Sequence, residues 1–392
     1  LNWGAPKSGA LAWITAMAIG IVVFKGDLQI MALANTKGMS LSLYVLLIIW
    51  GAVLLYNLVA EQGAIDVIGD TMTKVSKDRL LQCLLMSWCF AAFLQGIAGF
   101  GVPVAVVAPI MVVMGFTPAV AAASTLVGHC WSISFGSMGS SYYTIQLTTK
   151  IPGEMIGPWM AIMFLIPILT TGLAVAHIYG GVAAVKKAFP AIFVTSVVMG
   201  FACWLLNKIG AAQLATLVPG LLGCGAITLM ARSKMYADTE GTAGMIERKE
   251  ALPMGFGLAF SPYLVLIAIS ISSQIGPIKK FFSPYSWSLP FPELTTGLGY
   301  VVKAEKGYSS INILSHPAPL LFFAAIAAII IFGAAGKWRP GSFAKAFKNT
   351  VTQCVPTSYG IATMVMMALI MNDTGMTDVL AHGLAKATGA VF

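Results

Sequence analysis

Residues 93–105 read FLQGIAGFGVPVA, and this glycine-rich stretch separates two apolar arms, residues 81–94 and residues 104–114. Each arm is shorter than the about 20 residues that a helix needs to cross a hydrocarbon core. Gly99 and Gly101 permit backbone angles that strain other residues, and Pro103 favours the first turn of a following helix. The spacing therefore predicts a helical hairpin that re-enters a membrane and turns at the glycines.

An unwound turn at membrane depth restricts what can surround it. Its N–H and C=O groups need either protein or a water-filled cavity, because lipid cannot hydrogen-bond them. Secondary transporters bind their solutes at broken helices of this kind. The helix that starts after Gly101 would also offer free N–H groups and the positive end of its dipole to an anion. We therefore predict an anion pocket at the turn.

A second break follows the hairpin. Residues 118–127 are apolar, and residues 128–142 then read GHCWSISFGSMGSSY, so that polar groups lie where a spanning helix normally carries Leu or Val. His129 is an ionisable residue within this segment, which marks a functional site by default. The alternative is that the Ser and Gly residues only let helices pack closely. The position directly after the hairpin favours a role in the same pocket.

Both breaks resemble motifs of the lactate permease family. Residues 93–105 resemble its signature FLEGAAGFGAPVA, and residues 135–139, FGSMG, resemble its FGAMG. The resemblance implies a proton-coupled secondary transporter of lactate or related 2-hydroxy monocarboxylates, in a wider group of ion transporters built from inverted repeats with hairpins. Gln95 replaces the Glu of the family pattern, and His129-Cys130 replaces an Asn-Thr pair. Gln95 cannot carry a proton, so His129 becomes the candidate proton carrier; a neutral histidine bonded to a backbone carbonyl is the alternative.

These observations define one set of candidate site residues. Backbone amides at the hairpin turn would hold the substrate carboxylate, and nearby side chains would bind its second oxygen or the substrate hydroxyl. Phe100 and Trp131 are expected to close the pocket. No catalytic residue, metal site or cofactor is predicted. The predicted substrate-binding residues are Gln95, Gly99, Phe100, Gly101, Val102, Pro103, His129, Cys130, Ser132, Ser134 and Gly136.

Composition indicates the class of protein. The 392 residues are 58% hydrophobic and 9% charged, and their mean hydropathy is +0.86. These values exclude an ordinary soluble domain and predict an all-α, multi-pass protein of the inner (plasma) membrane. The net charge of +9 comes from basic residues in short loops, where they act as topology signals, so no nucleic-acid partner is predicted. The six cysteines read as buried small residues, with Cys130 as the candidate exception.

An internal repeat indicates two related halves. The sequence Gly63-Ala64-Ile65-Asp66 recurs 312 residues later as Gly375-Met376-Thr377-Asp378. Counting the predicted crossings places the two copies in opposite orientations, an arrangement that transporters use. The second copy would stop before its own hairpin, so we expect a chain that is partial at both ends; a complete chain with one hairpin is the alternative.

The predicted organisation has four parts. Residues 1–80 form scaffold helices and an amphipathic arm helix, and residues 81–153 form the hairpin and broken helix of the transport core. Residues 154–316 form connecting helices with a long extracytoplasmic loop at 276–316, and residues 317–392 begin the second repeat. The predicted partners are the lipid bilayer, a small carboxylate and a coupling ion, either H⁺ or Na⁺. The sequence leaves the oligomeric state open, with a homodimer as one option.

Three other functions are alternatives to a permease. A sodium-coupled carrier of another carboxylate fits the departures at Gln95 and His129. An anion channel differs from a carrier only in that its flux does not saturate. An intramembrane enzyme or a respiratory subunit needs paired acids, a metal cluster or haem-spaced histidines within its spans, and the sequence shows none of these patterns. An enzyme is therefore not predicted.

Overall fold

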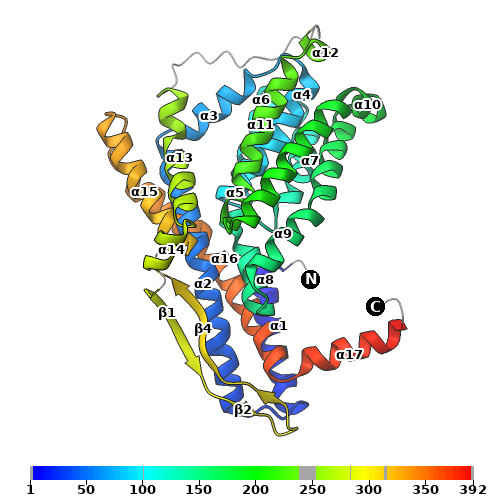
Figure 1. Cartoon of the computed structure of the whole chain (residues 1–392), viewed down its shortest axis with the longest axis vertical. Helices are drawn as coiled ribbons and strands as arrows, with labels where there is room; N and C mark the ends of the chain where they lie inside the picture. The colour runs from blue at the N-terminus through cyan, green and yellow to red at the C-terminus, as the bar shows by residue number, and fades with distance from the viewer. Residues whose placement is uncertain (1–2, 100, 238–252, 283, 313–315, 390–392) are drawn as a thin grey trace. The chain divides into compact units, whose positions relative to one another are not determined.

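The computed structural model describes residues 3–99, 101–237, 253–282, 284–312 and 316–389 (Figure 1). The chain divides into two compact units. Unit 1 contains Leu1–Leu47, Ser283–Ile313 and Val351–Phe392, and unit 2 contains Ile48–Phe282 and Leu314–Thr350. Two long helices, α2 (Leu28–Glu61) and α16 (Ser342–Asp373), are divided between the units, so that each helix has one part in unit 1 and the other in unit 2.

Unit 1 combines helices with a small β-structure. Besides parts of α2 and α16 it contains α1 (Ala5–Val22) and α17 (Met376–Thr388). Its antiparallel strand pairs are β1 (Ser286–Phe291) with β4 (Glu305–Asn312), and β2 (Leu294–Thr295) with β3 (Val301–Val302). The expectation of an all-α chain with a long loop at 276–316 is therefore wrong for this segment. Aromatic and β-branched residues favour strand pairing, as the Phe291 and Tyr308 rings show with centroids 5.7 Å apart.

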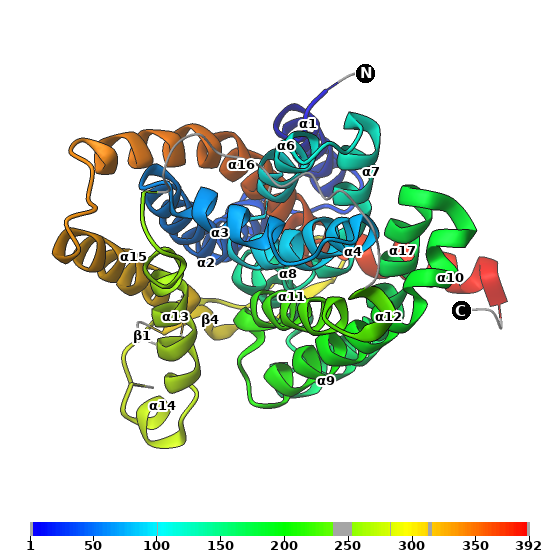
Figure 2. The ribbon, with the colours of Figure 1, turned by 90° about the horizontal axis from the view of Figure 1, so that it is seen from above.

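The regular secondary structure among the described residues of unit 2 is all helical. Its centre is the continuous helical run Arg79–Ile97, which is 94% buried over its apolar window and against which α7, α10 and α11 pack (Figure 2). The elements of unit 2, apart from its parts of α2 and α16, are α3 (Ala64–Thr73), α4 (Arg79–Leu84), the π-helix η1 (Leu85–Phe90), α5 (Ala91–Ile97), α6 (Val102–Val113), α7 (Pro118–Gly128), the 3₁₀-helix η2 (Cys130–Ser132), α8 (Gly136–Thr149), α9 (Gly153–Met163), α10 (Leu165–Lys208), the 3₁₀-helix η3 (Ala212–Leu214), α11 (Leu217–Ala231), α12 (Lys234–Ala237), α13 (Phe256–Ser272), α14 (Gly276–Phe282) and α15 (Pro317–Ala334).

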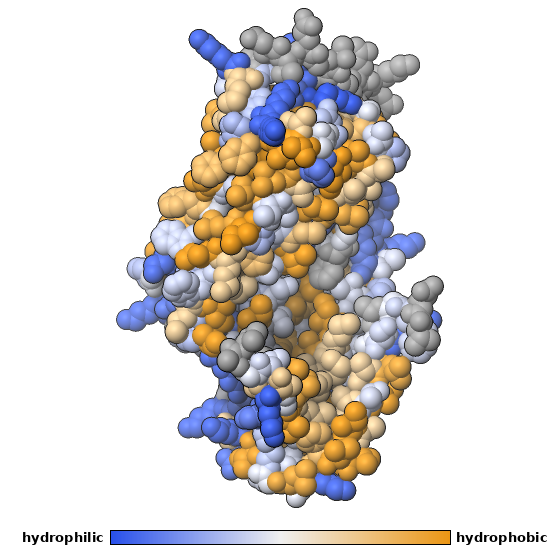
Figure 3. All heavy atoms as spheres, turned by 90° about the vertical axis from the view of Figure 1, so that its right-hand side faces the viewer, coloured by the Kyte–Doolittle hydropathy of each residue, from blue (hydrophilic) through white to orange (hydrophobic). Residues whose placement is uncertain are grey.

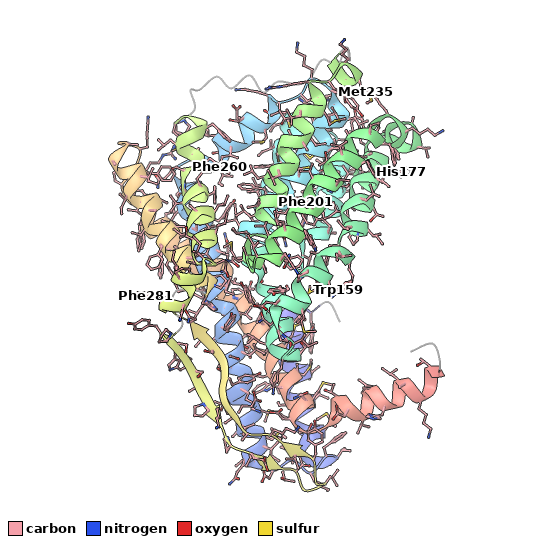
Figure 4. All side chains as sticks on the ribbon, in the orientation of Figure 1. Trp159, His177, Phe201, Met235, Phe260 and Phe281 are labelled. Atoms are coloured by element: carbon pink, nitrogen blue, oxygen red, sulfur yellow. The ribbon has the colours of Figure 1, made fainter. Side chains whose placement is uncertain are left out.

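Five described helical runs are long and apolar enough to cross a membrane. They are Leu28–Glu61, Arg79–Ile97, Gly153–Lys208, Pro317–Ala334 and Ser342–Asp373. Large apolar side chains of α9 and α10 are exposed, including Trp159 and Phe201, which Figure 4 labels. The side of the molecule drawn in Figure 3 carries broad apolar areas. An exposed apolar surface on helices of this length is what a lipid environment requires, so the chain is an integral membrane protein.

The arm helix is more buried than its amphipathic pattern indicates. The amphipathic pattern places Asp70 and Asp78 opposite the apolar residues, but both carboxylates are buried. Asp70 accepts a hydrogen bond from Lys74 at 2.7 Å, and Asp78 accepts one from Lys187 at 2.7 Å while its Oδ1 caps the start of α4. Each carboxylate is thus compensated by an ammonium group, which burial of a charge requires.

Helix bounds recur at the offset that the sequence repeat predicts. Helices α1 and α15 both have 18 residues, and each bound of α15 lies 312 positions after that of α1. Gly63 (φ 75°) and Gly375 (φ 83°) both adopt the left-handed conformation just before α3 and α17. Glycine adopts this conformation without strain. The equal bounds support the internal repeat; the opposite orientation of the complete copies stays a prediction.

The two long helices of the repeat run antiparallel where they meet within unit 2. Asn57 Nδ2 donates to Thr350 Oγ1 at 3.0 Å, and Gln62 Nε2 donates to Ser342 Oγ at 2.8 Å. The residue number therefore rises along α2 while it falls along α16. Polar side chains join two otherwise apolar helices here, which fixes their register.

Glycines set the distances between the central helices. A Cβ atom at Gly128 would lie 2.1 Å from the carbonyl oxygen of Ser87, and one at Gly96 would lie 2.4 Å from the amide nitrogen of Leu217. Backbone can approach this closely only where no side chain intervenes. Helix α7 therefore contacts η1, and α11 contacts α5, at backbone distance.

We expect Gly128→Ala to destabilise the protein by roughly 1–3 kcal/mol, because the added methyl group must push α7 away from η1. Gly225→Ala is the matched control, since a Cβ atom there meets nothing within 4 Å. Thermal unfolding of both variants in detergent, followed by circular dichroism, measures the difference. Equal melting temperatures for the two variants would contradict the close contact.

Candidate functional site

The first break joins two arms of a helical hairpin. The chain runs through α4, η1 and α5, breaks between Ala98 and Gly101, and returns as α6. The ends of the two arms meet, since Arg79 Nη1 donates to the carbonyl oxygen of Met114 at 2.5 Å. Gly101 has a φ of 85° and starts α6, and Pro103 lies in the first turn. The break lies at the predicted glycines, but the first arm, Arg79–Ile97, is long enough to be a candidate span, so the expectation that both arms are too short to cross is wrong for this arm. That the hairpin re-enters the membrane from one side stays a prediction.

The second break contains a left-handed turn. Ser137, Met138 and Gly139 have φ values of 47°, 54° and 76° inside α8. Two consecutive non-glycine residues with positive φ are uncommon, and such backbone persists only where surrounding contacts hold it. Residues in this conformation cluster at functional sites. The turn coincides with the FGSMG motif at residues 135–139.

The two breaks contact one another. The amide N–H of Gly99 donates to Ser137 Oγ at 2.9 Å. A Cβ atom at Gly99 would lie 3.0 Å from Gln95 Nε2, and one at Gly136 would lie 2.9 Å from the same nitrogen. The carboxamide of Gln95 therefore lies between two glycines that leave no room for a side chain. The structure brings together three predicted residues, Gln95, Gly99 and Gly136, and adds Ser137. We call these four residues the break junction.

Other predicted residues of the hairpin surround the turn. Val102 and Pro103 are buried, Gly101 is exposed, and Phe100 lies outside the described residues. The amide of Val102 donates to the carbonyl oxygen of Gly99 at 3.1 Å. Two amides at the turn, those of Gly99 and Val102, thus already have acceptors within the protein. An anion at this turn would rely on the remaining amides and on side chains.

The predicted side chains of the second break make local contacts. His129 Nδ1 is hydrogen-bonded to the carbonyl oxygen of Thr125, and Ser132 Oγ donates to that of His129 at 2.5 Å. Cys130 is exposed, and its Sγ donates to the carbonyl oxygen of Leu126. The alternative to a proton-carrying His129 was a histidine bonded to a backbone carbonyl, and the structure contains this hydrogen bond. Ser134 is partly buried, and its carbonyl oxygen accepts from the amide of Tyr142 at 3.0 Å.

Sequence reasoning missed Gln213. This residue of η3 is fully buried, and its Oε1 accepts a hydrogen bond from Tyr143 Oη at 3.0 Å. Its Nε2 is a buried donor without a hydrogen-bond partner among the described residues. The Cα of Gln213 lies 3.4 Å from a Cβ atom built on Gly139, so η3 packs directly against the left-handed turn. A lone glutamine in an apolar stretch was the available signal.

Trp131 was expected to close the pocket. It is fully buried next to the second break, and its Nε1 has no hydrogen-bond partner among the residues that the structure describes. A buried indole N–H normally finds a partner. Two buried donors therefore lie at the second break, Trp131 Nε1 within it and Gln213 Nε2 on η3, which packs against it. Within the described parts of the chain, no group of three or more His, Cys, Asp or Glu is placed to hold a metal ion.

We expect Ser137→Ala to destabilise the protein by about 1–3 kcal/mol, because the buried amide of Gly99 loses its acceptor. Ser141→Ala is the control, since Ser141 is exposed in the same helix. Thermal unfolding in detergent measures both variants. A melting temperature of Ser137→Ala that equals the control would show that the hydrogen bond between the breaks contributes no stability.

Comparisons with known proteins place this chain in a family. The profile of the family described as L-lactate permease matches residues 2–392. An L-lactate permease of Salmonella typhi is 26% identical over 98% of this chain and 73% of its own length, and one of Escherichia coli K12 is 27% identical over the same shares. The Escherichia coli K12 glycolate permease GlcA is 26% identical, again over 98% of this chain and 73% of its own. No solved structure matches the chain.

Proposed function

Because the chain belongs to the L-lactate permease family, we propose that it is a secondary active transporter of lactate or a related short 2-hydroxy monocarboxylate. The relatives named for lactate and for glycolate support this substrate class. Both substrates carry one carboxylate and a neighbouring hydroxyl. The location that we propose is the plasma membrane, which suits a chain with five candidate spans.

The observation that carries the proposed site is the hydrogen bond between Gly99 and Ser137. It joins two unwound segments, and unwound segments are where transporters of this architecture bind solutes. Gln95 Nε2 lies at the same junction and can donate to a carboxylate. Gln213 Nε2 and the remaining amides near Gly101 supply further donors. We propose that the substrate binds at the break junction, with the earlier candidates His129, Cys130, Ser132 and Ser134 around its rim.

Charge balance favours cation coupling. Moving one elementary charge across 100 mV costs about 2.3 kcal/mol, so a carboxylate that enters a negatively charged interior alone works against the membrane potential. A proton that travels with the carboxylate removes this cost. We therefore propose proton symport, with sodium symport as the alternative. Gln95 carries no charge in either case, so the proton binds elsewhere in the chain.

We further propose that alternating access involves two inverted repeats. The recurring bounds of α1 and α15 and the antiparallel contact of α2 with α16 support this architecture. Inverted repeats allow two conformations of similar energy, each open to one side of the membrane. The hairpin would move relative to the scaffold helices or rock with them.

Purified protein in proteoliposomes should take up labelled lactate in a saturable manner when the outside is more acidic than the inside. A protonophore should abolish accumulation above the equilibrium level, since it removes the gradient that drives it. A sodium gradient at constant pH distinguishes the alternative ion, and competition by unlabelled glycolate tests the substrate class. Uptake no higher than in protein-free vesicles, for every short hydroxy acid, would refute the proposed function.

Gln95→Ala should raise the KM for lactate uptake by about tenfold or more, because it removes a hydrogen-bond donor to a charged group, worth roughly 1.5–3 kcal/mol. Gln146→Ala is the matched control, since Gln146 is a partly buried glutamine of α8 outside the break junction. The KM values come from initial rates in the same proteoliposomes. An unchanged KM in Gln95→Ala would remove this residue from the substrate site.

A further inference from the structure

Unit 1 contains a buried cluster of charged side chains that the sequence analysis did not single out. Lys37 of α2 is only 1% exposed. Its Nζ lies 3.1 Å from Glu305 Oε1 of β4 and 3.4 Å from Asp373 Oδ2 at the end of α16. The rings of Phe291 and Tyr308 cover the ammonium group, with centroids 5.7 and 5.8 Å from Nζ. Lys37, Glu305 and Asp373 form what we call the charge triad.

The charge triad has one positive group for two carboxylates. When all three groups are ionised, their charges sum to −1, and the buried Asp373 shares the Lys37 ammonium with Glu305. Asp373 is 3% exposed, and its Oδ1 accepts a hydrogen bond from Asn372 at 3.1 Å. Its Oδ2 has no hydrogen-bond partner among the described residues, although Lys37 lies at ion-pair distance. A proton on Oδ2 would neutralise the triad.

The internal repeat provides a comparison for this cluster. The positions 312 residues away from Lys37 and Asp373 hold Asn349 and Glu61, respectively. These two counterparts also contact each other, since Asn349 Nδ2 donates to Glu61 Oε1 at 3.1 Å. The cation that pairs with Glu61 is Lys345, at 2.9 Å, and its side chain is 69% exposed.

The comparison shows whether packing of the two long helices requires a buried charged pair. The two long helices make the same contact at the repeat-related position with a neutral amide in place of a buried ammonium group. Helix packing therefore does not require the ion pair between Lys37 and Asp373. Buried ion pairs also contribute little net stability compared with neutral replacements. Ionisable residues retained inside a membrane protein mark ion pathways and proton relays.

We propose that Asp373 is the site at which the coupling proton binds. In this step a proton from the aqueous phase forms an O–H bond with Asp373 Oδ2, and Lys37 then pairs with Glu305 alone. The triad becomes neutral, and no other bond is made or broken. The inference rests on the proposed proton symport and assigns the proton to a residue other than His129.

The titratable groups around Asp373 come from four elements. Burial and the carboxylates of Glu305 and Asp373 raise the pKa of Tyr308, so this phenol stays neutral at physiological pH. Burial and a hydrogen bond with Asp378 likewise raise the pKa of Tyr300. Both phenols therefore stay protonated near neutral pH and do not take up the coupling proton. The facing groups are Lys37 of α2, Glu305 and Tyr308 of β4, Tyr300 between β2 and β3, and Asp378 of α17.

Two transport modes of the full chain test the assignment. Accumulation driven by a pH gradient requires net proton movement, whereas exchange of external labelled lactate for internal lactate requires none. We expect Asp373→Asn to lower gradient-driven accumulation by about tenfold or more, because the amide cannot take up a proton, while exchange stays within about twofold of wild type. Glu61→Gln, the repeat-related control, should retain both activities.

Three outcomes bear on the proposal. Wild-type accumulation by Asp373→Asn with an unchanged pH dependence would overturn it, and so would loss of both modes in a variant that elutes as folded protein. If Asp373→Asn does not fold, Asp373→Ser, which also cannot ionise and keeps the ion pair of Lys37 with Glu305, replaces it and should again exchange lactate without accumulating it.

A second readout does not depend on lactate. Infrared difference spectra of the purified wild type across a pH titration should contain a protonated carboxyl band that is missing from Asp373→Asn. Absence of such a band from the wild type would overturn the proton site. Its presence in a protein that transports no hydroxy acid would refute the proposed function alone.

Discussion

Backbone polarity at the two helix breaks is the constraint on which the rest of unit 2 depends. An unwound segment inside a membrane protein exposes N–H and C=O groups that lipid cannot satisfy. Here the breaks satisfy each other in part, since Ser137 accepts from the amide of Gly99. This requires the backbone of α8 to reach the hairpin turn, which is possible only because Gly99 and Gly136 lack side chains. The glycine contacts of Gly96 and Gly128 extend the same close packing to neighbouring helices.

The sequence was sufficient to locate the two helix breaks. Glycine, proline and serine interrupt apolar runs at residues 98–103 and 128–139, and the structure breaks its helices at these places. Local chemistry determines such features, so a single sequence reveals them. The repeat was visible for the same reason, because Gly63 and Gly375 must both adopt a left-handed conformation.

Features that depend on distant partners were not predictable. In the sequence Lys37 lies just before an apolar run, and only folding places it beside Glu305 and Asp373. The hydrogen bond of Gln213 likewise depends on Tyr143, which lies 70 residues earlier. The strands at 286–312 were read as a loop, because their partners lie across a turn and their apolar residues are sparse. Long-range pairing, rather than local pattern, decides each of these cases.

The arginine at the base of the hairpin has a mechanical consequence. Arg79 ties the first arm to Met114 at the end of the second, and its guanidinium lies 4.4 Å from the Phe116 ring centroid. The opposite tip is anchored to α8 through Ser137. A segment fastened at both ends cannot swing as a free flap. A displacement of the hairpin alone would therefore break one of these contacts, whereas a displacement shared with α8 would keep the contact to Ser137.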